Sequence, residues 1–163
     1  MDGEEIHKLL LDEIGIGEQV GVYVAERGVF AYSDDLIPPK GHGFGKSVSF
    51  RWTKGCDDPD CAKRRYKLTI RPIIHKKTGD VKAILVRLDY SYQYLYDPPY
   101  NSSHAWLIAP EPFNMILRRN PPLDSEGVPE RFTYPYTTTF PATVNPKLFS
   151  ELYKAWVRKV RGR

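Results

Sequence analysis

Two cysteines, Cys56 and Cys61, enclose a short acidic loop and are the first residues whose spacing could serve chemistry. The C-x4-C spacing supplies half of a tetrahedral zinc site, which His42 or His104 would have to complete because no second ligand pair is present. A disulfide is also feasible over so short a span. Because a reducing cytosol opens most such bonds, unlinked thiols are the expected state. Cys56 and Cys61 are thus candidate metal ligands, and a zinc protein or enzyme built on this loop ranks third among the functions that the sequence allows.

A glycine-rich stretch over residues 41–47 ends in Gly45-Lys46-Ser47 and is similar to the phosphate-binding Walker loop. That motif needs a further glycine with four residues between it and Gly45, and this chain has Lys40 there. No serine lies in a nucleophile elbow, and no histidine is paired with an acid at the spacing of a general base. The sequence therefore predicts neither a catalytic residue nor a cofactor, and leaves open an enzyme whose site is assembled from distant residues.

Alternating tyrosines point to one side of an expected strand over residues 81–96: Tyr90, Tyr92, Tyr94 and Tyr96. If that side is exposed, the rings form a stacking platform for single-stranded nucleic acid. If it is partly covered, they suit a protein interface. The third possibility is a core beneath an aromatic C-terminal helix. We expect Tyr90 and Tyr92 in the core, and Tyr94, Tyr96 and Tyr100 on an interaction surface.

The net charge of +4 is distributed unevenly along the chain. Residues 1–40 carry a net charge of −6 and residues 41–87 one of +8, whereas residues 88–150 carry −2 and residues 151–163 carry +4. Basic segments of this kind favour a polyanionic partner; the alternative is an internal dipole, with the acidic N-terminal part lying over the basic middle. The candidate nucleic-acid contacts are Lys46, Arg51, Lys54, Arg65, Lys67, Arg71, Lys76, Lys77, Arg158 and Arg161.

Periodicity and capping signals predict the elements that must position these residues. Asp2 and Glu5 form a capping box before a short amphipathic helix, and Asn145 precedes a proline at the start of a second helix. The expected elements between them are a hairpin over 19–33, strands over 47–52, 64–75, 81–96 and 104–109, a helix or strand over 113–119, and an edge strand over 131–143. In the 64–75 strand, Leu68 and Ile70 face the core and the basic residues face outward.

These elements predict one α+β domain over residues 1–163, with a mostly antiparallel sheet of five to seven strands flanked by an N-terminal and a C-terminal helix. No stretch approaches the ~20 apolar residues of a membrane-spanning helix. The acidic N-terminus does not resemble a signal peptide. We therefore expect a cytoplasmic protein without a membrane partner.

The element order resembles that of ubiquitin-conjugating-like domains: a leading helix, antiparallel strands, a tyrosine-rich segment ending in Pro98-Pro99, His104 and a closing helix. Active members of that family place a cysteine after this histidine, and this chain has none beyond Cys61. The resemblance implies a non-catalytic binding variant. The leading hypothesis is nevertheless a non-enzymatic nucleic-acid-binding protein with a basic patch, and the alternative is a protein-interaction module, including a homodimer.

Overall fold

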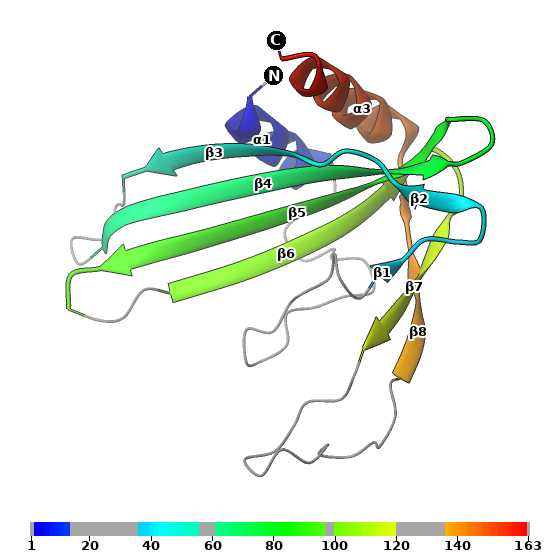
Figure 1. Cartoon of the computed structure of the whole chain (residues 1–163). Helices are drawn as coiled ribbons and strands as arrows, with labels where there is room; N and C mark the ends of the chain where they lie inside the picture. The colour runs from blue at the N-terminus through cyan, green and yellow to red at the C-terminus, as the bar shows by residue number, and fades with distance from the viewer. Residues whose placement is uncertain (1, 14–35, 56–60, 97–99, 120–135, 163) are drawn as a thin grey trace.

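The computed structural model describes residues 2–13, 36–55, 61–96, 100–119 and 136–162 (Figure 1). The helices are α1 (Gly3–Glu13) and α3 (Pro146–Val160). The strands are β1 (Leu36–Ile37), β2 (His42–Phe44), β3 (Val48–Lys54), β4 (Cys61–His75), β5 (Val81–Tyr94), β6 (Tyr100–Ala109), β7 (Asn114–Arg119), β8 (Tyr136–Pro141) and β9 (Thr143–Val144). The hairpin expected over 19–33 lies outside the described residues.

The described strands form two sheets, and most of their pairs are antiparallel. In the larger sheet β4 pairs with β5 and β5 with β6, while β2 and β3 pair with successive parts of β4. β9 joins β6 in parallel. The smaller sheet has the order β1-β7-β8. The predicted α+β fold, a mostly antiparallel sheet with an N-terminal and a C-terminal helix, is confirmed, and the second sheet was not expected.

The capping signals at both helix starts are confirmed. The Asp2 carboxylate accepts a hydrogen bond from the Glu5 backbone N–H at 2.9 Å, and the Glu5 carboxylate accepts one from the Asp2 N–H at 3.1 Å. This reciprocal pair satisfies N–H groups that have no partner within the helix. The Asn145 side chain accepts from the Leu148 N–H at 3.0 Å at the start of α3. Both helices therefore begin where the sequence predicts.

One side of the larger sheet is buried beneath both helices. Leu68 and Ile70 of β4 and Val86 of β5 are fully buried in a cluster that includes Ile6 of α1 and Leu152 of α3. Figure 1 shows α1 and α3 together on this side. We name it the helix side. The prediction that Leu68 and Ile70 face the core is confirmed.

The other side of the larger sheet is covered by the smaller sheet near one end. Ile73, Leu85 and Leu107 of the larger sheet form a second buried cluster with Leu36 of β1 and Met115 of β7. In Figure 1 the smaller sheet meets the larger one near β2 and diverges from it beyond that point. Past this cluster, the residues of β3, β4 and β5 on this side are mostly polar.

Two segments that were hard to assign from sequence are strands. Residues 113–119 contain β7 rather than a helix, because β7 pairs on both sides, with β1 and with β8. β8 lies at the edge of the smaller sheet, in agreement with the edge strand expected over 131–143, and Pro141 is its last residue. Proline is tolerated there because an edge strand leaves one row of N–H groups unpaired.

Candidate functional site: a basic face of the larger sheet

Six cationic side chains lie on the side of the larger sheet that faces away from the helices. Directly opposite residues of antiparallel strands share a face, and the register pairs Arg51 with Lys67 and Thr69 with Arg87. Residues two apart on a strand share a side, so the pairs identify every residue of β3, β4 and β5 on this side. We name its six cations the basic face: Arg51, Lys63, Arg65, Lys67, Arg71 and Arg87. Asp89 is the one carboxylate on the same side of these strands. Six positive charges and one negative charge leave a formal net charge of +5.

A cavity of about 270 Å³ lies on the basic face where the second core cluster begins. Its lining contains the cations Lys67, Arg71 and Arg87, the Asp89 carboxylate and the Thr69 hydroxyl. Ser47 and two buried apolar residues of the second cluster complete the wall. We name this cavity the end pocket. It combines positive charge and hydrogen-bond donors, as an anion site requires.

Two of the three cations in the end pocket are positioned by neighbouring side chains. The Arg87 Nε donates to Asp89 Oδ1 at 3.0 Å, and both side chains are about one-third exposed. The Arg71 guanidinium carbon lies 4.0 Å from the ring centroid of Phe44, within the range of a cation–π contact. The Lys67 ammonium makes no ion pair with the described part of the chain. The pocket thus presents two oriented guanidinium groups and one ammonium that has no ion-pair partner among the described residues.

Four of the ten predicted nucleic-acid contacts lie together on the basic face: Arg51, Arg65, Lys67 and Arg71. Three of them are at alternate positions of β4, and side chains at such positions point to the same side. The sequence prediction missed Lys63 and Arg87, which are also on this face. The same alternation, extended along β4 and β5, would have found both.

The other six predicted contacts lie elsewhere. Lys54 is on the helix side because it is opposite Arg64, and its ammonium is 2.7 Å from the Glu4 carboxylate of α1. The loop before β3 holds Lys46, the turn between β4 and β5 holds Lys76 and Lys77, and exposed positions at the end of α3 hold Arg158 and Arg161. These residues do not add to the basic face.

The tyrosine row lies on the helix side, beyond the aliphatic core. Trp52, Tyr66, Tyr90 and Tyr92 make successive ring contacts with centroids 5.2, 6.1 and 5.7 Å apart. The ring of His7 in α1 contacts those of Trp52 and Tyr66. The C-terminal helix was expected to cover the tyrosines; instead, α1 borders them, because α3 buries its apolar stripe on the aliphatic part of the same side.

Burial raises the pKa of the Tyr66 phenol above its usual value near 10; Tyr92 raises it further, and Arg64 acts in the opposite direction. In the unfolded chain the phenol ionises near pH 10, whereas the folded state keeps the proton to higher pH. This contribution to stability is therefore complete below about pH 10 and is lost as the pH rises through the folded pKa.

We expect the Tyr66→Phe variant to lose less unfolding free energy above about pH 10 than the unmodified protein loses. Tyr153→Phe, which removes a phenol on α3, is the control. Equal alkaline profiles for the two variants, measured by urea unfolding, would contradict this assignment.

The residues of the predicted interaction surface differ in exposure at and after the end of β5. Tyr94 is half-buried, whereas Leu95 is 59% exposed and Tyr96 is 84% exposed. Tyr100 begins β6, and its side chain lies outside the described residues. Of the two predicted tyrosines whose side chains the structure describes, Tyr96 is the more exposed.

Cys61 begins β4 and is disulfide-bonded, which corrects the expectation of unlinked thiols. Cys56 lies outside the described residues. A sulfur in a disulfide is not a thiolate and does not ligate zinc. Within the described ranges, no three histidine, cysteine, aspartate or glutamate side chains form a group that could hold a metal ion.

No family model, curated protein or solved structure matches this chain. The resemblance to ubiquitin-conjugating-like domains rests on element order alone. No helix in the described part of the chain is long and apolar enough to cross a membrane. The basic face is the feature of the described residues with the clearest chemical preference.

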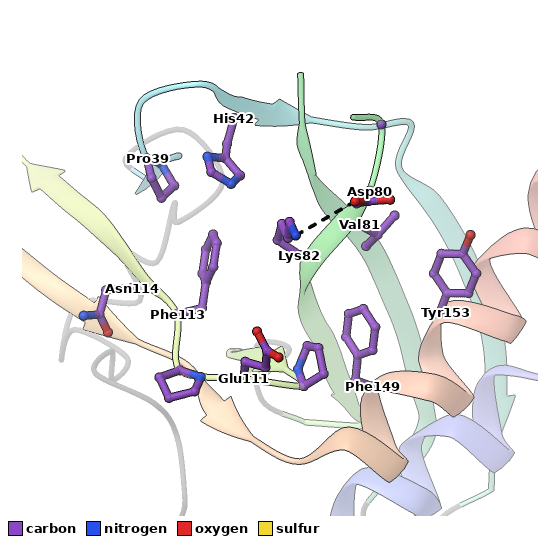
Figure 2. Close-up of a pocket in the computed structure, with 13 residues that line it drawn as sticks. Pro39, His42, Asp80, Val81, Lys82, Glu111, Phe113, Asn114, Phe149 and Tyr153 are labelled. Atoms are coloured by element: carbon purple, nitrogen blue, oxygen red, sulfur yellow. Dashed lines mark ion pairs between the residues drawn. The ribbon is translucent and has the colours of Figure 1, made fainter. Parts of the chain in front are cut away.

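A larger cleft of about 770 Å³ lies where α3, the β4–β5 turn and the segment before β7 converge (Figure 2). Phe113 and Phe149 form aromatic walls on opposite sides, and the carboxylate of Glu111 points into the space between them. The Lys82 ammonium is 4.0 Å from the Asp80 carboxylate. The cleft has the size of a small-molecule site. Because charges of both signs line it, it does not share the preference of the basic face for an anion.

Proposed function

We propose that this protein binds nucleic acid through its phosphates, along the basic face. The observation that carries the proposal is the register of β3, β4 and β5, which places six cations and one carboxylate on one side of the sheet. Lysine and arginine contacts to phosphate supply affinity without reading the base sequence. The core of a protein interface is depleted of charge, so this face suits a polyanion better than a protein surface.

Titration of a labelled oligonucleotide at several salt concentrations tests the proposal. If all six cations contact phosphates, the logarithm of the affinity should fall with the logarithm of salt concentration with a slope of about −4 on a single strand and about −5 on a duplex. Arg158→Ala removes a cation of α3 that is not on the basic face, and this control variant should show the same slope as the unmodified protein. Absence of binding even at low salt would overturn the proposal.

The alternative function, a protein-interaction module or homodimer, is favoured by the exposed pair at the end of β5. Leu95 and Tyr96 are large hydrophobic residues with 59% and 84% exposure. Tyrosine is common at protein interfaces because it has an apolar body and a polar tip. Sedimentation equilibrium tests for the homodimer. If the protein dimerises through this pair, the average mass should rise with protein concentration, and Tyr96→Ser should lower it. A constant monomer mass would argue against self-association.

A further inference from the structure

Exposure decreases along the basic face toward the second core cluster. The open end holds Arg51, Lys63 and Arg65, which are exposed. Lys67 and Arg71 come next along β4 and are half-buried. Leu85, opposite Arg71, is 3% exposed, and Ile73, the next residue on this side of β4, is fully buried. The basic face is therefore open at one end and closed at the end pocket.

A strand of nucleic acid lying along the basic face cannot continue past the end pocket. The smaller sheet packs on the residues that follow, with Leu36 and Met115 buried against Ile73 and Leu85. A nucleic-acid strand that lies parallel to β4 would therefore place its end in the pocket. At about 270 Å³ the pocket is smaller than the roughly 300–1,000 Å³ of drug-sized ligand sites, which fits a small terminal group.

The charge of the end pocket matches a terminal phosphate better than a phosphate within the backbone. A phosphate monoester carries about −1.5 to −2 charges at neutral pH, whereas each backbone phosphate carries one. Lys67, Arg71 and Arg87, less Asp89, give the pocket a formal charge of +2. The two arginines are already positioned by Asp89 and Phe44, so that little side-chain freedom is lost on binding.

We propose that the end pocket binds the terminal phosphate monoester of a nucleic-acid strand, an inference that rests on the proposed function. Lys67 supplies an ammonium that makes no ion pair with the described residues, and the two arginines supply directed N–H donors. The Thr69 hydroxyl, which shares a hydrogen bond of 3.3 Å with the Ser49 hydroxyl, adds a polar group to the wall. A mononucleotide presents the same chemical group. The experiment therefore includes a strand and a mononucleotide as separate probes.

Affinity is measured for one oligonucleotide that carries a 5′-phosphate, a 3′-phosphate or hydroxyls at both ends, and for the corresponding 5′-mononucleotide. Because hydrogen bonds to a charged group are strong, we expect the strand with one phosphorylated end to bind about tenfold or more tighter than the strand with hydroxyls at both ends. Lys67→Met keeps the apolar stem and removes the charge. It should abolish this preference, whereas Arg65→Met at the open end should weaken all strands alike and retain the preference.

The outcomes separate the two proposals. Equal affinity of phosphorylated and unphosphorylated strands overturns the inference and leaves the proposed function standing, whereas no binding of any strand overturns both. A preference that survives Lys67→Met, or a mononucleotide that binds as tightly as the phosphorylated strand, also overturns the inference. Lys67→Arg should keep the preference, and thermal unfolding of each variant checks that the fold is intact.

Discussion

Replacing Leu68 with alanine is expected to lower the free energy of unfolding by about 2–5 kcal/mol. Leu68 lies at the centre of β4, is fully buried, and packs in the cluster beneath both helices. Alanine would leave a cavity that the paired neighbours of β4 prevent the backbone from closing. Since domains are typically stable by only about 5–15 kcal/mol, this is a large fraction of the total. Urea unfolding followed by circular dichroism measures it.

Lys67→Met is the matched control for this prediction. Lys67 is adjacent to Leu68 on the same strand, but its side chain is on the opposite side of the sheet and half-buried. Removing its charge while keeping the apolar stem should change the unfolding free energy by less than about 0.5 kcal/mol. If both substitutions lower the unfolding free energy by the same amount, the assignment of the two sides of β4 would be wrong.

Local sequence signals predicted the elements that depend on neighbouring residues. The alternation around Leu68 and Ile70 predicted β4 and its two sides, because the side-chain period of a strand is two. Asp2, Glu5 and Asn145 predicted the helix starts, because capping bonds span only three residues. These signals were sufficient for the fold class.

Pairings between distant residues were not predictable in this way. The smaller sheet joins Leu36 to Leu117, and nothing local to either residue specifies that partner. The end pocket depends on this sheet, since Leu36 is part of the cluster that closes it. Arg87 was not predicted because it is a single cation within the apolar run over 83–88, and only its pairing with Thr69 on β4 places it on the basic face.

The double charge reversal Arg51→Glu and Arg65→Glu is expected to weaken oligonucleotide binding at low salt by at least about 100-fold. Both residues are at the exposed open end of the basic face. The change removes two phosphate contacts and places two carboxylates where phosphates would lie. The salt slope should decrease in magnitude by about 2, because each lost phosphate contact accounts for about 1. Both substitutions are on the surface, so thermal unfolding should change little.

The reversal Arg158→Glu and Arg161→Glu changes the net charge of the protein by the same amount on α3 and is the matched control. Both arginines are exposed, and α3 packs on the side of the larger sheet opposite the basic face. If binding depends on where the cations lie, this control should keep most of the affinity. If it depends on net charge alone, both pairs of substitutions should weaken binding equally. A greater loss of affinity in the α3 variant would show that the C-terminal helix, and not the basic face, contacts nucleic acid. That result would also overturn the terminal-phosphate inference.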